Sequence, residues 1–292
     1  MVPQLLANGI ATSAECALLA VGFGLIYHTS KVFHFAHGAT FVVAAYLFYS
    51  FYSQLRMGLV LAAVLVILLA GLLGLLIDVL VYRPLDRKGS SALGQLLSSV
   101  GCYIVLVNSL PILYDNQSKQ VFAGVVPMRE FLGVRLTEVQ IGGIVFASFV
   151  ICSVAVVLRV TTLGKLIRAL RDDPQLLALT GSDPGLVRSA VFVGGSGLAG
   201  AAAVLHSLDV GIEPTIGLPA FLAATVAMIV GGTRSFEAAA FGALLLGVLQ
   251  NAAVRLMANE WREPATFIIF VLFLLFRPQG LLSSSRRTEE IQ

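Results

Sequence analysis

The sequence predicts an all-α membrane protein whose helices cross the bilayer eight or nine times. Of its 292 residues, 58% are hydrophobic and only 12% are charged, whereas an ordinary soluble domain has about 25% charged residues. The hydropathy is concentrated in long runs, and residues 59–80 are apolar on every face. A run of about 20 such residues spans a bilayer as a helix, whereas the strands of a membrane barrel are short and alternating. A soluble globule and a barrel are therefore excluded.

The apolar runs define nine candidate spans within a single transmembrane domain over residues 1–292. The spans cover residues 5–27, 35–52, 59–80, 92–113, 140–158, 186–206, 219–233, 236–256 and 264–276. No basic segment precedes the first run, so we expect a span there and not a removed signal peptide.

Lysine and arginine residues fall unequally on the two sides of this arrangement. Nine crossings place the termini on opposite sides, and thirteen of the nineteen Lys and Arg residues lie on the side of the C-terminus. Because these residues concentrate in cytoplasmic loops, we expect a multi-pass protein of the bacterial inner membrane with a cytoplasmic C-terminus.

Two of the nine spans carry signs of interruption. The span 35–52 has His37 and Gly38 near its start, and the span 219–233 follows Pro214 and Gly217. Interrupted segments at corresponding places in two halves are typical of transporters built from inverted repeats, whose solute sites lie at mid-membrane. Two ordinary spans with one kink each are the alternative.

Residues 159–185 form a polar insertion with a helical pattern. Apolar residues recur at the spacing of one helix face and basic residues occupy another; they are Leu163, Leu166, Ile167 and Leu170, and Lys165, Arg168 and Arg171. Thr161 or Thr162 can cap this helix. Asp172 and Asp173 precede Pro174 and open a second helix that ends at Gly181. From this pattern alone, the pair either lies in the lipid headgroup layer or docks into a groove on another protein.

The insertion resembles the cytoplasmic coupling segment of the permease subunits of ABC importers for branched-chain amino acids. That family reads T-x-x-G-x-x-x-R-A, then acidic residues, then A-x-x-x-G. The matching residues are Thr161, Gly164, Arg168, Ala169, Asp172, Asp173, Ala178 and Gly181. Weaker likenesses to the family lie at residues 33–46, 82–85 and 228–250, so the resemblance extends over about residues 5–281.

Three residues depart from the family pattern inside the membrane. His34 stands where the family usually has Asn, Ala39 where it often has Glu, and Gln250 where Glu commonly occurs. Polar groups in the membrane are costly and usually functional. A relative of branched-chain amino acids, such as another amino acid, an amide or urea, is therefore also a candidate solute.

The resemblance implies a transport subunit without enzymatic activity or a cofactor of its own. The single Gly-Lys pair, Gly164-Lys165, is followed by Leu166 and not by the Ser or Thr of a P-loop. We therefore expect two separate ATP-binding cassette subunits, which use ATP and move residues 161–181 as a lever. The other implied partners are a second, related permease subunit and an extracytoplasmic substrate-binding protein, with no role for nucleic acid.

Candidate pathway residues are Glu15, His34, His37, Gly38 and Gln250. Glu15 lies midway in the first span, where an unpaired carboxylate costs a few kcal/mol, so it should face protein, a partner or water. We place the two histidines three residues apart on one helical face. Because no further ligands accompany them, we expect hydrogen bonds around a helix break and no metal.

Other polar and small residues have structural interpretations. Asp78 lies beside Tyr82 and Arg83 at the end of its span, where pairing or snorkelling is expected. Glu237 should form a local ion pair with Arg234 or act as a charge at a helix N-terminus. The four glycines Gly194, Gly195, Gly197 and Gly200 indicate close helix packing, within the chain or against a partner permease.

Two other functional classes compete with the importer. An ion- or proton-coupled secondary transporter would use Glu15 or Asp78 as its coupling carboxylate. An intramembrane enzyme would use Glu15 or the histidines as acid and base, although no nucleophile lies at a recognisable spacing from them.

Overall fold

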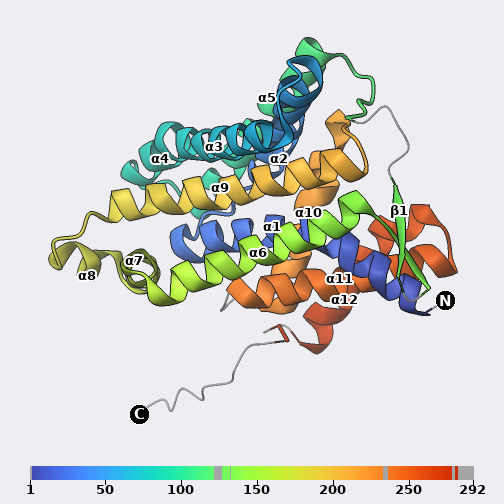
Figure 1. Cartoon of the computed structure of the whole chain (residues 1–292). Helices are drawn as coiled ribbons and strands as arrows, with labels where there is room; N and C mark the ends of the chain where they lie inside the picture. The colour runs from blue at the N-terminus through green and yellow to red at the C-terminus, as the bar shows by residue number, and fades with distance from the viewer. Residues whose placement is uncertain (1, 122–126, 132, 233–235, 278–279, 282–292) are drawn as a thin grey trace.

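The computed structural model describes residues 2–121, 127–131, 133–232, 236–277 and 280–281, and these form a helical bundle (Figure 1). Its helices are α1 (Val2–Ser30), α2 (His37–Phe48), α3 (Leu59–Ile77), α4 (Arg83–Arg87), α5 (Ala92–Tyr114), α6 (Glu138–Val160), α7 (Thr162–Asp172), α8 (Pro174–Leu179), α9 (Pro184–Asp209), α10 (Gly217–Gly231), α11 (Phe236–Leu256) and α12 (Arg262–Phe276). Helices satisfy their backbone hydrogen bonds internally, as lipid requires. The predicted all-α, polytopic class is confirmed.

Seven helices of the described residues are long and apolar enough to cross a membrane. They are Val2–Ser30, Leu59–Arg87, Ala92–Tyr114, Glu138–Val160, Pro184–Asp209, Pro214–Gly231 and Glu237–Leu256. The helix Leu59–Arg87 combines α3, a π-helical segment at Asp78–Tyr82 and α4. Two of the nine expected spans, 35–52 and 264–276, correspond to the shorter helices α2 and α12, of 12 and 15 residues.

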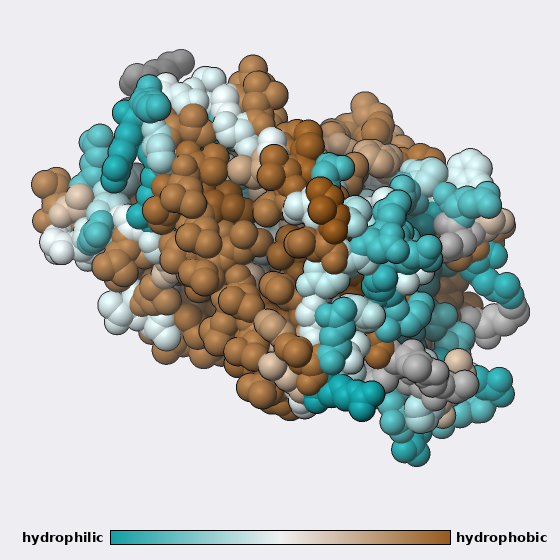
Figure 2. All heavy atoms as spheres, turned by 90° about the horizontal axis from the view of Figure 1, so that it is seen from above, coloured by the Kyte–Doolittle hydropathy of each residue, from teal (hydrophilic) through white to brown (hydrophobic). Residues whose placement is uncertain are grey.

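The two ends of the bundle carry different structures. Helices α7 and α8 lie at one end, while the N-terminus and a hairpin of β1 (Met128–Phe131) and β2 (Val134–Thr137) lie at the other (Figure 1). This antiparallel hairpin was not predicted from the sequence. Figure 2 shows hydrophobic residues over the middle of one face and hydrophilic residues gathered toward its ends, as expected for a protein surrounded by lipid at its middle.

The two interrupted spans meet at the starts of α2 and α10. The chain is not helical from Lys31 to His34, turns at residues 35–36 and enters α2 at His37; α10 follows a 3-10 turn at Pro214–Ile216. A Cβ on Gly38 would lie 2.8 Å from the Gly217 carbonyl oxygen, and one on Gly217 would lie 2.9 Å from that of Gly38. Only glycine permits this approach of two backbones. Non-helical or 3-10 residues thus precede both helices, whereas re-entrant helices and an inverted repeat between the halves stay predictions.

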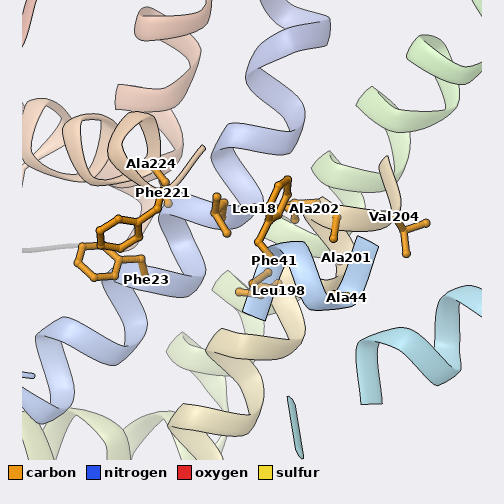
Figure 3. Packing of buried hydrophobic residues seen from close by; sticks show 14 of the residues in the cluster. Leu18, Phe23, Phe41, Ala44, Leu198, Ala201, Ala202, Val204, Phe221 and Ala224 are labelled. Carbon is orange, nitrogen blue, oxygen red and sulfur yellow. The ribbon is translucent and has the colours of Figure 1, made fainter. Parts of the chain in front are cut away.

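The core is centred on α1 and α9, which pack closely through small residues. A Cβ on Gly195 would lie 2.7 Å from the Gly22 carbonyl oxygen, and one on Gly200 would lie 2.7 Å from the Ala70 Cβ. The glycines of α9 therefore serve packing against α1 and α3 of the same chain, one of their two predicted roles. Figure 3 shows Leu198 and Ala202 of this interface beside Phe41 of α2.

Candidate functional site

A cavity of about 450 Å³ opens among α1, α9, α10, α11 and α12, in the half of the bundle nearer the hairpin. Its polar lining consists of Thr12, Glu15, His206, Glu213, Thr215, Gln250, Arg262, Glu263 and Thr266. The remaining wall is largely apolar and comes mainly from Leu19, Phe41, Leu218, Pro219, Leu222, Ala223 and Phe267. The volume and the mixture of an apolar wall with a few polar groups are typical of small-molecule sites.

Glu15 and His206 form the central polar pair of this cavity. A Glu15 carboxylate oxygen lies 2.9 Å from His206 Nδ1, and the two side chains are 27% and 13% exposed. Of the three expected surroundings of Glu15, protein is confirmed, since its carboxylate pairs with His206 and lines the cavity. Sequence reasoning missed His206 because nothing local in the last turn of α9 indicates a partner 191 residues away. An otherwise unpaired carboxylate on α1 was the available signal that such a partner must exist.

Gln250 faces the same cavity from α11. Its side-chain amide donates a 2.7 Å hydrogen bond to Thr266 Oγ1 of α12, and the residue is 7% exposed. Arg262 and Glu263, at the start of α12, are exposed at the rim. Because the lining carries charges of both signs beside an apolar wall, it can accommodate a zwitterion with an aliphatic side chain.

The remaining candidate pathway residues are buried and do not line the cavity; they are His34, His37 and Gly38. Both histidines are fully buried, and their ring centroids are 5.6 Å apart. His37 Nε2 donates to the backbone carbonyl of Leu19, a cavity residue, at 3.3 Å, while His34 Nδ1 lies 2.7 Å from Tyr82 Oη. Hydrogen bonding around a helix break is thus confirmed. The prediction of one shared helical face is wrong, because His34 precedes α2 and only His37 is helical.

The predicted helix pair between α6 and α9 is confirmed as α7 and α8. Thr161 Oγ1 caps α7 by accepting from the Gly164 amide at 3.2 Å, and Asp173 caps α8 with Pro174 as its first residue. Gly181 follows with φ +83°, a left-handed conformation that favours glycine at a helix end.

One face of this helix pair is fixed to the bundle. Ile167, Leu170 and Leu177 are buried with residues of α1, α6 and α9. A Cβ on Gly164 would overlap the Leu158 carbonyl oxygen, and the Arg168 guanidinium donates to that same oxygen. Two of the predicted coupling residues therefore hold α7 against the end of α6.

The opposite face of the pair is open. Ala169, Asp172, Asp173 and Gly181 are exposed, and so are the apolar residues Leu176 and Leu179 of α8, at 61% and 84%. Asp172 forms an exposed ion pair with the adjacent Arg171.

A buried ion cluster joins the start of α9 to the segment after α3. Asp78, with no exposed surface, accepts from Arg83 Nε and Arg188 Nε, both at 2.8 Å. Arg188 also contacts Asp86 at 2.6 Å, and Arg83 donates to Ser189 Oγ. The predicted Asp78 to Arg83 pair is confirmed, whereas the contribution of Arg188 was missed because it is 110 residues away.

Glu237 pairs with Arg159 at 2.8 Å. Its expected partner Arg234 lies outside the described residues. Within the described part of the chain, His, Cys, Asp and Glu side chains do not gather in groups of three or more that could hold a metal ion.

These features define a multi-pass helical membrane protein with a largely apolar cavity that carries a few polar groups, and with a helix pair at one end that exposes one of its faces. The chain belongs to the family of permease components of branched-chain amino acid transport systems, whose model matches residues 5–276. It is 30% identical to the high-affinity branched-chain amino acid transport system permease protein BraD of Pseudomonas aeruginosa, over 96% of this chain and 95% of that protein. It is 27% identical to LivH of Escherichia coli, a permease protein of the same kind of system, over 96% and 94%.

One solved structure shares the fold. It is PsaBC from Streptococcus pneumoniae in complex with Fab, with a TM-score of 0.54 and 12% identity over 94% of this chain and 92% of that one. At this identity the likeness concerns the fold alone.

Proposed function

We propose that this chain is the permease subunit of an ATP-driven importer and forms the pathway for a branched-chain amino acid or a similar small zwitterionic solute. The observation that carries the proposal is the pair α7 and α8, which is packed on the bundle through one face and exposes Leu176 and Leu179 on the other. An exposed apolar face on a short helix suits a groove on a partner protein. Membership of the permease family supports an ATPase as that partner.

The coupling role falls on Thr161, Gly164, Arg168, Ala169, Asp172, Asp173 and Gly181. The first three fix α7 to the end of α6, so a push on the exposed face is transmitted to the bundle as a rigid movement. Two ATP-binding cassette subunits would bind and hydrolyse ATP, and this chain would bind no cofactor. A second permease subunit, related to this one, would complete the pathway within the lipid bilayer.

The solute enters from an extracytoplasmic substrate-binding protein into the cavity. Glu15, Gln250 and Arg262 offer an acceptor, an amide and a cation, while Leu19, Leu218 and Leu222 offer an apolar wall. An amino acid presents an ammonium, a carboxylate and an aliphatic side chain, which match these three kinds of group. We place the cavity on the outer side of the bacterial inner membrane, and α7, α8 and the C-terminus on the cytoplasmic side, from the distribution of Lys and Arg.

The test uses the complete complex in lipid vesicles, with uptake of radiolabelled leucine and ATP hydrolysis measured together. Leu179→Asp places a charge on the exposed face of α8, and we expect it to abolish ATP-driven uptake while the complex remains inserted. Met128→Asp, on the hairpin at the opposite end and 71% exposed, is the matched control and should transport normally. Normal uptake by the Leu179 variant would refute the docking role.

The same vesicles distinguish the importer from an ion- or proton-coupled secondary transporter. The pair of Glu15 and His206 supports this alternative, because a paired carboxylate and imidazole in a cavity can carry protons. Uptake driven by a proton gradient without the ATPase subunits would establish it in place of the importer.

A further inference from the structure

We propose that Phe33, together with Phe23, Phe35 and Phe221, closes the pathway immediately inward of the cavity and acts as its inner gate. This inference rests on the proposed function. The first observation is that the face of α1 that lines the cavity continues toward the α7–α8 end of the bundle. The wall residues Thr12, Glu15, Cys16 and Leu19 recur on one helical face, and the next position of that face, four residues on, is Phe23.

The aromatic side chains at this level contact one another in a closed set. The ring centroids of Phe23 and Phe221 are 5.2 Å apart, those of Phe23 and Phe33 5.3 Å, and those of Phe33 and Phe221 5.9 Å, all in edge-to-face geometry. Phe35 adds a contact of 4.9 Å to Phe221. These distances are in the range of favourable aromatic pairs. Figure 3 shows Phe23 of α1 beside Phe221 of α10.

The rings come from three segments, so a relative movement of these segments opens the set. Phe23 lies on α1, Phe221 on α10, and Phe33 and Phe35 on the non-helical link between α1 and α2. Phe23 and Phe221 have no exposed surface, whereas Phe33 and Phe35 are half-buried. The link residues therefore form the side of the set that can leave with the least loss of packing.

Hydrogen bonds, together with the covalent step from Tyr82 to Arg83, connect this link to the start of α9, which follows the helix pair α7 and α8. His34, between the two link phenylalanines, contacts Tyr82 Oη at 2.7 Å. Tyr82 directly precedes Arg83, which binds Asp78 and the Gly185 carbonyl oxygen at the start of α9, close after α8. A displacement of α7 and α8 thus reaches Phe33 and Phe35 through the ion cluster and Tyr82. This connection gives a physical route from the ATPase to the gate.

The experiment measures access of water-soluble reagent to the cavity from the α7–α8 side, in the complete complex without ATP. A chain freed of its three cysteines carries Ala223→Cys in the cavity wall, and a membrane-impermeant maleimide is added from that side. We expect Phe33→Ala to accelerate labelling at least about tenfold, because an opened gate admits water and reagent to a site that closure had sequestered. Phe35→Ala, in the same link, should act in the same direction and serves as the second variant if the first fails to assemble.

Phe149→Ala is the matched control, since this phenylalanine of α6 is 70% exposed and lies outside the set. Labelling that stays slow in assembled Phe33 or Phe35 variants, or that rises equally in the control, overturns the gate. The readout needs neither solute nor ATP. Failure of leucine uptake in the unmodified complex would therefore count against the proposed function alone, while the labelling result would still decide the gate.

Discussion

The buried carboxylate of Asp78 holds the start of α9 to the segment after α3, and the substitution Asp78→Asn tests how strongly. The asparagine side chain keeps one oxygen as an acceptor and presents an amide N–H where the second carboxylate oxygen stood. One of the two arginine contacts at 2.8 Å is therefore lost, and the other loses its charge.

The magnitude follows from the exposure of the partners. A hydrogen bond to a charged group contributes about 1.5–3 kcal/mol, and removing one partner of a fully buried pair costs about 3–5 kcal/mol. Here the arginine side chains are 25% and 19% exposed, so water compensates part of the loss. We expect Asp78→Asn to lower the free energy of unfolding by about 2 kcal/mol. Because the entropy of unfolding grows with chain length, this lowers Tm by about 3 °C for a chain of 292 residues.

The assay is the thermal midpoint of the purified protein in one detergent, followed by loss of monodisperse protein on heating. Asp172→Asn is the matched control, because Asp172 makes a single ion pair and is 65% exposed; exposed pairs contribute about 0.2–1 kcal/mol. A double-mutant cycle of Asp78→Asn with Arg188→Gln should give a coupling of at least about 1 kcal/mol. Equal, small shifts for both aspartates, with no coupling to Arg188, would refute the reasoning.

Three further predictions concern the helix pair, the cavity and the buried tyrosine. Gly164→Ala places a Cβ against the Leu158 carbonyl oxygen, so α7 must move; we expect ATP hydrolysis without matching uptake, and an unchanged ratio of the two would contradict this. Glu15→Gln and His206→Gln each remove the ion pair of the cavity, and each should lower leucine uptake at least about tenfold in line with the loss of one charged contact, measured as initial rate in vesicles. Tyr82→Phe removes the hydroxyl that makes two buried hydrogen bonds, to His34 and Ser99. It should lower the free energy of unfolding by about 1–3 kcal/mol, and an unchanged Tm would contradict this.

Sequence patterns predicted those features that depend on neighbouring residues. The caps at Thr161 and Asp173 and the end at Gly181 follow from residues within one or two helical turns, and all three are found where expected. The partner of Asp78 at Arg83 is likewise local. Long-range partners were not predictable from one sequence, because apolar periodicity states which face of a helix is buried and not which helix covers it.

Two residues on α9 illustrate why long-range partners were not predicted. His206 and Arg188 both lie on α9, and both bind carboxylates on other helices. A single membrane carboxylate such as Glu15 indicates that a partner exists, but several histidines and arginines satisfy that requirement equally well. The hairpin of β1 and β2 was not predicted, because strands of four residues are too short to show a clear alternation of apolar and polar residues.

The placement of His206 and Arg188 on one helix also explains how the two ends of the protein can act together. Helix α9 begins at Pro184, shortly after α8 ends at Leu179. It carries Arg188 of the ion cluster in its second turn and His206 of the cavity wall in its last turn. Its 26 residues span about 39 Å at 1.5 Å per residue. Because Gly195 packs against the backbone of Gly22, α9 cannot slide along α1 without breaking that contact. Under the proposed function, we therefore expect a push at α8 to tilt α9 about this glycine contact and to move His206 relative to Glu15 at the other end.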